Sequence, residues 1–157
     1  MKSFKAEHLG QPLQSPFSTA PELVWQRAVA DFATRHQLPL QDVMAGARFA
    51  FREVGFQLHY NVEVDARGLV VMMDLGEMPA SAAHHVQLGM LATNARGPAA
   101  ALGYQAIIPG TRRGVHCVRL DVDKCDEPST AISATVVSLA LTVGEFRAAL
   151  KGALMGA

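Results

Sequence analysis

The chain has 157 residues, half of them hydrophobic and 18% charged, and its 14 basic residues balance its 14 acidic ones. This length is typical of one domain, and the zero net charge argues against a basic nucleic-acid-binding surface or an acidic tail. Charged residues make up about a quarter of an average soluble protein. The low share here predicts that a partner buries some of the apolar surface.

Cysteine content and hydropathy favour a reducing, cytoplasmic location. Cys117 and Cys125 are too few for a disulfide scaffold and lack the paired CxxC spacing of a structural zinc site. The N-terminal residues 1–11 contain no apolar core of the kind a signal peptide needs. The longest apolar window, 131–143, is shorter than the ~20 residues that span a bilayer. We therefore expect it to be a buried helix, with no membrane insertion.

The first third of the chain predicts an arm, a helix and a strand. Residues 1–20 lack periodicity and are expected to form a flexible N-terminal arm, leaving 21–157 as a single α+β domain. Trp25, Val29 and Phe32 recur at helical spacing, which predicts a helix from about 21 to 37. A connector through Gly46 leads to alternating residues 47–54, a half-buried strand with Phe49 and Phe51 on one face.

The middle of the chain predicts two further strands and a helix. Residues 56–65 alternate between apolar and polar types, the strongest strand pattern in the sequence. The run 69–73 is apolar at every position, as expected of a strand covered on both faces. Pro79 begins a helix that ends near 94–97.

The last third predicts a hairpin of 104–108 and 115–122, followed by a helix from Pro128 to about Leu150 or beyond. The complete order is helix, three strands, helix, two strands, helix. The sequence thus predicts an α+β fold with a mainly antiparallel, twisted sheet and three helices.

Candidate chemical groups do not converge on a recognisable active site. His84 and His85 are adjacent on a helix, and His116 and Cys117 are adjacent on a strand, so neither pair points at one metal ion. We expect no metal, no cofactor and no catalytic residue. Arg96, Arg112, Arg113 and Arg119 form a basic region that could bind phosphate, and the acidic stretch 121–127 is interpreted as a solvated loop.

Several local patterns resemble those of class I type III secretion chaperones of the Tir chaperone (CesT) family, over roughly residues 21–154. The sequence Leu75-Gly76-Glu77-Met78-Pro79 is similar to the L-G-x-L-P junction of that family. Similar matches are the helix end Leu88, Leu91, Asn94, the strand start Gly103, the strand 114–120, and Phe146-Arg147-Ala148-Ala149-Leu150.

The resemblance implies a small homodimeric chaperone without ATPase activity in the cytoplasm of a Gram-negative bacterium. Such proteins hold the N-terminal segment of a secreted effector in extended form until it reaches the secretion apparatus. This chain departs from many family members in being neutral rather than acidic, and its first helix begins some twenty residues late.

Aromatic and apolar residues are the candidates for partner contacts, because exposed apolar patches mark protein-binding surfaces. Five residues are the candidates for effector contacts: Trp25, Val29, Phe32, Phe49 and Phe51. Only some of these five are expected to contact the effector, and the others should support the surface from beneath. Val86 and Met90 on the second helix are the candidates for the dimer interface.

Two other functions remain open from the sequence. A small hot-dog-like enzyme or ligand-binding domain could place His59 or His116 beside Asp74 as a general acid or base. An obligate oligomeric scaffold without a client would also account for the apolar composition.

Overall fold

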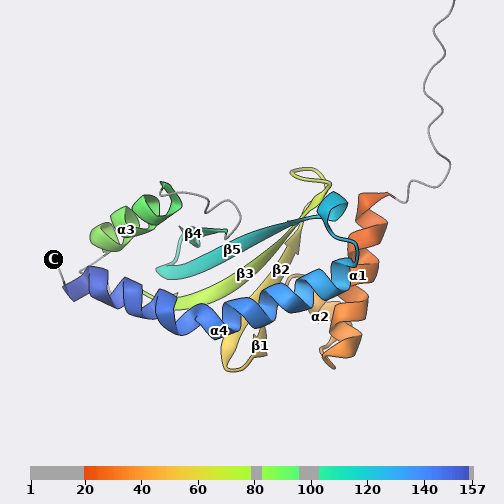
Figure 1. The fold of residues 1–157 in the computed structure, drawn as a ribbon, viewed down its shortest axis with the longest axis horizontal. Coiled ribbons are helices and arrows are strands. Elements are labelled where there is room, and N and C mark those ends of the chain that lie inside the picture. The colour runs from red at the N-terminus through yellow and green to blue at the C-terminus, as the bar shows by residue number, and fades with distance from the viewer. Residues whose placement is uncertain (1–19, 79–82, 96–102, 156–157) are drawn as a thin grey trace, which may run out of the picture.

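The computed structural model describes residues 20–78, 83–95 and 103–155 (Figure 1). Most of the predicted arm and the expected start of the second helix at Pro79 lie outside these ranges. A short 3-10 turn, η3 (Val122–Lys124), precedes the last helix. The main elements in chain order are α1 (Pro21–Arg35), α2 (Leu40–Met44), β1 (Phe49–Phe51), β2 (Val54–Tyr60), β3 (Gly68–Glu77), α3 (Ala83–Ala95), β4 (Tyr104–Ile107), β5 (Arg113–Asp121) and α4 (Pro128–Met155).

The strands form one sheet in the order β1-β2-β3-β5-β4, and every neighbouring pair is antiparallel. This arrangement confirms the predicted α+β fold. The described chain has four α-helices rather than the three predicted, because the expected connector contains α2. Five residues after Pro39 are too few to show helical periodicity in the sequence.

One face of the sheet carries the core. In β3 the side chains of Leu69, Val71 and Met73 are buried, whereas Val70 and Met72, which point to the opposite face, are only partly buried. Helix α4 runs along the buried face, from α1 at one end of the molecule to α3 at the other (Figure 1). The expectation that 69–73 is covered on both faces is therefore wrong for the single chain, since its helices bury only one side.

The β1–β2 hairpin turns two residues earlier than the sequence suggested. Phe51 pairs with Val54, so Arg52 and Glu53 form the two-residue turn, with φ values of 48° and 65°. Positive φ is typical of such tight hairpin turns but is usually supplied by Gly or Asn. Gly55, which lies between the predicted strands 47–54 and 56–65, is instead inside β2, which ends at Tyr60 rather than continuing to residue 65.

A β-bulge interrupts β3 directly after Asp74. The register against β5 shifts between Asp74 and Gly76, and Gly76 has a φ of 102° that a residue with a side chain rarely adopts. The Asp74 carboxylate accepts a hydrogen bond from the Gly76 amide at 2.8 Å. Leu75 belongs to the core cluster, whereas Asp74 lines a cavity on the opposite face of the sheet, as expected for adjacent residues of a strand.

Candidate functional site

An apolar groove lies where α1, α2 and the β2–β3 strands meet. It encloses about 170 Å³ and is lined by Trp25, Gln26, Val29, Val43, Met44, Leu58, Tyr60 and Leu69. Most of the lining side chains are buried and form its floor, but Met44 is 44% exposed at its rim. Met44 could not be predicted as a lining residue from the sequence, because a methionine in the expected connector gives no periodic signal.

The five predicted effector-contact residues differ in burial, and two of them line this groove. Trp25 and Val29 line it, although both are buried. Phe32 and Phe49 are buried beside each other, with ring centroids 5.6 Å apart. Phe51 is partly buried on the edge strand β1, and the Arg52 guanidinium lies 5.7 Å from its ring centroid. Only Phe51 among the five presents a partly open side chain near the sheet edge.

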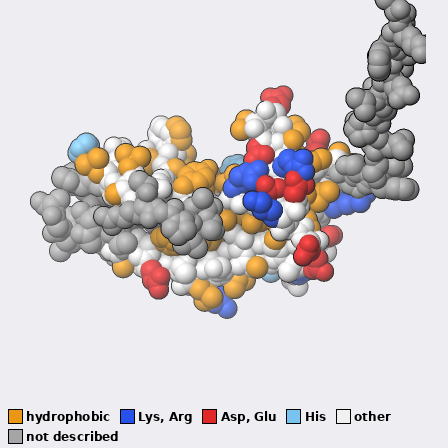
Figure 2. Space-filling view, turned by 45° about the horizontal axis from the view of Figure 1, so that its top comes forward, with side chains coloured by type: hydrophobic (Ala, Val, Ile, Leu, Met, Phe, Trp, Pro, Cys, Tyr) orange, Lys and Arg blue, Asp and Glu red, His pale blue; other side chains and the backbone are white. Residues whose placement is uncertain are grey.

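A second apolar surface covers α3 and β4. Leu88 and Leu91 are 51% and 63% exposed, and Tyr104 is also exposed. In Figure 2 hydrophobic side chains gather over the α3 side of this face of the molecule. A shallow cavity of about 270 Å³ lies between the two elements, lined by Gln87, Met90, Leu91, Asn94, Gln105, Ala106 and Ile107.

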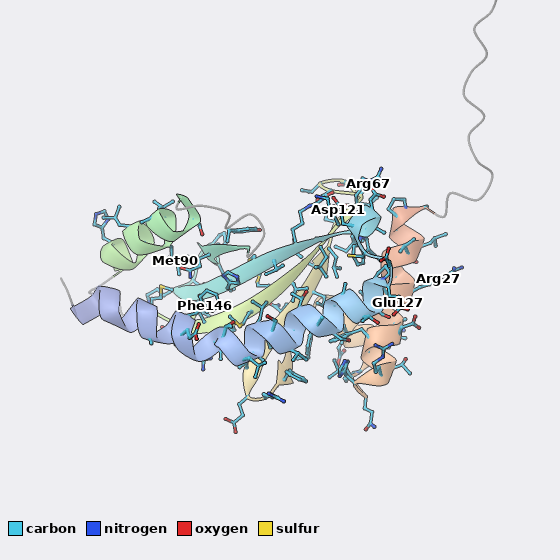
Figure 3. The ribbon with its side chains drawn as sticks, viewed as in Figure 1. Arg27, Arg67, Met90, Asp121, Glu127 and Phe146 are labelled. Carbon is cyan, nitrogen blue, oxygen red and sulfur yellow. The ribbon has the colours of Figure 1, made fainter. Side chains whose placement is uncertain are left out.

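The two predicted dimer-interface residues are both on α3. Met90 is only 4% exposed, and its methyl group packs close to Gly114 of β5, where an added Cβ would lie 3.1 Å away. Figure 3 shows Met90 on the α3 side of the molecule, above Phe146 of α4. Met90 therefore supports this surface from beneath. The side chain of Val86 lies outside the described part of the structure.

Asn94 joins α3 to β4 at the edge of this surface. Its side-chain amide donates to the Gln105 carbonyl and accepts from the Gln105 amide, both at 2.8 Å. These two hydrogen bonds satisfy the backbone N–H and C=O groups of Gln105, whose strand β4 pairs with β5 along its other edge. The structure thus gives a physical role to the asparagine in the Leu88, Leu91, Asn94 pattern.

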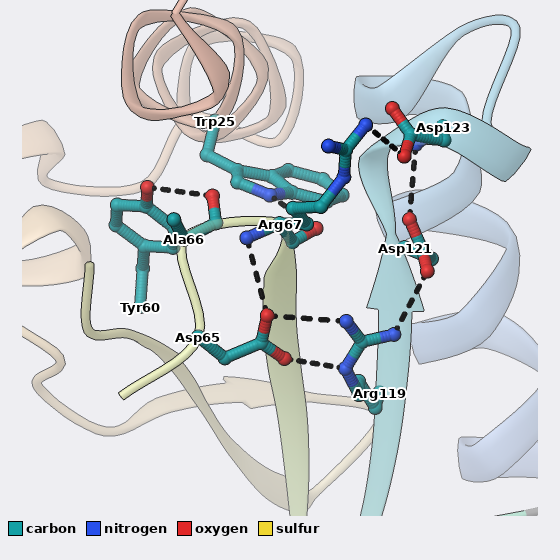
Figure 4. A network of polar contacts seen from close by, with 8 residues as sticks. All are labelled: Trp25, Tyr60, Asp65, Ala66, Arg67, Arg119, Asp121 and Asp123. Carbon is teal, nitrogen blue, oxygen red and sulfur yellow. Dashed lines mark hydrogen bonds and ion pairs between the residues drawn. The ribbon is translucent and has the colours of Figure 1, made fainter. Parts of the chain in front are cut away.

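Charged side chains gather at the opposite end of the sheet, around the β2–β3 turn (Figures 2 and 4). Arg119 donates from Nε to Asp65 Oδ2 at 2.5 Å and from Nη1 to Asp121 Oδ2 at 3.1 Å. The hydrogen bond from Arg119 lowers the pKa of the Asp65 carboxyl. Arg67 pairs with Asp123 of η3. These contacts close the turn against β5 and η3.

The predicted basic region is divided between separate acidic partners. Arg119 belongs to the turn network, Arg112 pairs with Glu77 at 2.6 Å, and Arg113 pairs with Asp74. Arg96 lies outside the described residues. The arginines therefore do not form the single phosphate-binding patch that their closeness in sequence suggested.

The residues required by the enzyme alternative lie apart. His116 pairs with Met73 and packs against Phe146, with ring centroids 4.5 Å apart, so it is on the helix-covered face. Asp74 is on the opposite face. His59, whose pKa is lowered by burial, shares that face but pairs with Val70, four residues along β3 from Asp74. At about 3.4 Å per residue this separation exceeds the reach of a hydrogen bond.

Within residues 20–78, 83–95 and 103–155, no group of three His, Cys, Asp or Glu side chains could hold a metal ion. One helix is long and apolar enough to cross a membrane by length and composition alone: the segment Pro128–Ala148 of α4, with a mean hydropathy of 1.4. Core helices of soluble proteins pass the same test. Here α4 packs on α1, α3 and the sheet.

The fold matches that of one chain in a solved structure of a complex. The matched chain belongs to the crystal structure of the ExsC–ExsE complex, with a TM-score of 0.61 and 16% sequence identity over 80% of this chain and 92% of that chain. At this identity the likeness shows the fold. No family model and no curated protein matches the sequence.

Proposed function

We propose that this chain is a type III secretion chaperone, which binds the N-terminal region of a secreted effector and keeps it secretion-competent without ATP. The observation that carries the proposal is the fold shared with a chain of the ExsC–ExsE complex along most of both chains. The motifs Leu75-Gly76-Glu77-Met78-Pro79 and Leu88, Leu91, Asn94 support the same function from the sequence. The chaperone acts in the cytoplasm and meets the secretion apparatus indirectly, through its effector.

Two features of the described structure suit an extended effector segment. The groove between α1, α2 and β2 offers an apolar floor with Met44 at its rim. Strand β1 is at the edge of the sheet and carries the partly open side chain of Phe51. An extended chain can add to a sheet edge through its backbone, while pockets read its side chains. In this proposal Phe51 and Met44 contact the effector, and Trp25, Val29, Phe32 and Phe49 support the surface.

The chaperone is proposed to act as a homodimer through α3 and β4. Leu88, Leu91 and Tyr104 expose apolar surface on these two elements, and β4 is the other edge strand of the sheet. A two-fold axis brings the same patch of each protomer together, so one exposed apolar patch is sufficient for a closed dimer. Met90 supports this interface from within its own protomer, and Val86 remains a candidate contact on the same helix.

Affinity capture from the native host tests the function. The tagged chain should retain a secreted protein through its N-terminal region, and deletion of the chaperone should lower secretion of that protein. Depleting or adding ATP should leave the retained amount unchanged. If the intact chain retains no secreted protein, or if deletion leaves secretion unchanged, the proposed function is wrong.

Matched variants test the effector surface. Met44→Glu and Phe51→Glu place a charge on the proposed contact surface, and each should reduce effector capture at least about tenfold, because an unpaired charge in an apolar contact is costly. Val64→Glu is the control, since Val64 is 82% exposed in the loop before β3. Circular dichroism checks that all three variants fold. Normal capture by both folded surface variants would show that the effector binds elsewhere.

A further inference from the structure

A cavity lined by charged and apolar side chains lies on the face of the sheet opposite α1 and α4. It encloses about 270 Å³, opens to solvent and is separate from the apolar groove described above. Three charged side chains meet there, and its walls include apolar atoms from β2, β3 and β5. The lining residues are Arg48, Gly55, Phe56, Gln57, Met72, Asp74, Ile108, Arg113 and Val115.

Two arginines approach one carboxylate from opposite sides of the cavity. Arg48, which precedes β1, places Nη2 2.8 Å from Asp74 Oδ2, and Arg113 at the start of β5 donates to the same oxygen. The second Asp74 oxygen accepts from the Gly76 amide of the bulge. Burial alone raises the pKa of Asp74, but these hydrogen bonds and positive charges outweigh it, so the pKa lies below its ordinary value. Asp74 is therefore ionised at neutral pH.

Gly55 allows Arg48 to lie across the sheet. A Cβ at position 55 would sit 2.1 Å from Arg48 Nε, so any side chain there would displace the guanidinium. Gly55 is inside β2, where glycine weakens a strand and marks a close approach of other atoms. Here the approaching group is the cation at the mouth of the cavity.

The charges of the cavity do not cancel. Arg48 and Arg113 contribute two positive charges and Asp74 one negative charge, leaving an excess of one positive charge among the lining residues. Nearby Glu77 is balanced by Arg112 at 2.6 Å. Each guanidinium has five N–H donors, and one carboxylate oxygen engages only a few of them. Both arginine side chains are also about half exposed.

We infer that this cavity binds one carboxylate side chain, a glutamate or aspartate of the bound effector segment. The inference rests on the proposed function for the source of that side chain. A monoanion matches the excess of one positive charge, whereas a phosphate dianion would be undercompensated and repelled by Asp74. The apolar walls from Met72, Val115 and Ile108 suit the methylene groups of an acidic side chain.

The binding chemistry can be measured with small probes on the complete chain. We would titrate ¹⁵N-labelled protein with N-acetyl-glutamate methylamide, N-acetyl-glutamine methylamide and inorganic phosphate at equal ionic strength. The glutamate probe should shift the amide signals of Gly55 and Gly76 and the Nε signals of both arginines. It should bind about tenfold more tightly than the glutamine probe, because charge-assisted hydrogen bonds are about twice as strong as neutral ones. Equal binding of both probes, or tighter binding of phosphate, would overturn the inference.

Variants separate cavity binding from overall charge. Arg48→Gln removes the charge at the cavity mouth, and Gly55→Ala displaces that charge without removing it. Both should weaken glutamate-probe binding about fivefold or more. Arg147→Gln is the control, because it removes one positive charge from an exposed position on α4. Unchanged binding in both folded cavity variants contradicts the inference, as does equal weakening in the control.

The captured effector supplies the last test. The acidic residues of the effector are replaced one at a time with the corresponding amides, and each effector variant is captured with the wild-type chain and with the Arg48→Gln chain. One replacement should weaken capture by the wild-type chain without further weakening capture by the Arg48→Gln chain. If an effector is captured and no such replacement exists, the inference fails while the proposed function stands. If no secreted protein is captured, the proposed function fails, and with it an effector as the source of the carboxylate.

Discussion

The indole Nε1 of Trp25 donates a hydrogen bond to the backbone carbonyl of Arg67 at 3.2 Å, joining α1 to the turn before β3 across 42 positions of sequence. The same turn is held by Tyr60, whose hydroxyl donates to the Ala66 carbonyl at 3.0 Å. Figure 4 shows Trp25 and Tyr60 at the turn together with the charged network of Asp65, Arg119 and Asp121. The floor of the apolar groove and the charged turn are therefore parts of one connected structure.

Trp25→Phe should lower the free energy of unfolding by about 1–2 kcal/mol, because it removes this hydrogen bond and part of a fully buried ring. Trp25→Ala should lower it by about 3–5 kcal/mol. Urea unfolding measures both values. Leu23→Ala, at an exposed position on the same helix, should change it by less than about 0.5 kcal/mol. Equal effects at positions 23 and 25 would contradict this role of Trp25.

Asn94→Ala should loosen β4, because the Gln105 amide and carbonyl both lose their partner on α3. The expected loss is about 1–2 kcal/mol of stability, the usual cost of unsatisfied backbone groups that are partly buried. Hydrogen exchange of the Gln105 amide should accelerate by about tenfold or more. Gln87→Ala, an exposed substitution on the same helix, is the control and should leave that exchange rate unchanged.

The elements of the fold could be predicted where periodic burial shapes the sequence. The stripe Trp25, Val29, Phe32 is buried on α1, and the apolar run 69–73 is part of β3. It was harder to predict which face of each strand is buried. A continuous apolar run is usually covered on both sides, yet Val70 and Met72 remain partly open in the single chain. Which face a helix covers depends on tertiary packing, which a local pattern does not contain.

The candidate surfaces were predicted less completely than the fold. Phe32 and Phe49 are typical interface residue types, but composition cannot distinguish an exposed aromatic ring from a core ring. Met44 gave no local signal, because the five-residue helix α2 is too short to show periodicity. The Arg48–Asp74–Arg113 cluster gave none either, because its residues come from separate segments that meet only in the folded sheet. The Gly76 amide that donates to Asp74 belongs to a bulge, and the positive φ of Gly76 can be recognised only in the structure.

Leu91→Glu should dissociate the proposed homodimer. Leu91 is the most exposed leucine described on α3, so a charge there is tolerated by the single chain but would be buried without a partner in the dimer. The dissociation constant should rise at least about tenfold, as measured by light scattering over a dilution series. Leu141→Glu, at a similarly exposed position on α4, should leave the dimer intact. A monomeric wild-type chain at micromolar concentration would contradict the homodimer itself.

Asp74→Asn should remove stability that depends on pH. The pKa of Asp74 in the folded chain lies below the ordinary value of 3.8, so ionised Asp74 stabilises the fold above that pH. This stabilisation decreases as the pH falls below 3.8 and is lost below the folded-state pKa. The wild-type chain should therefore exceed the variant by about 1–2 kcal/mol near pH 7. The pH-dependent part of this difference should disappear in strong acid.

Denaturant unfolding of both chains between pH 2 and 7 measures that difference. Asp31→Asn, at an exposed position on α1, is the matched control and should change the free energy of unfolding by less than about 0.5 kcal/mol at pH 7. A constant difference for Asp74→Asn would show that the two arginines do not stabilise the ionised carboxylate. A difference that grows toward acid would reverse the sign of the expected pKa shift. The count of one excess positive charge in the cavity assumes that Asp74 is ionised. Either result would remove the support for that assumption.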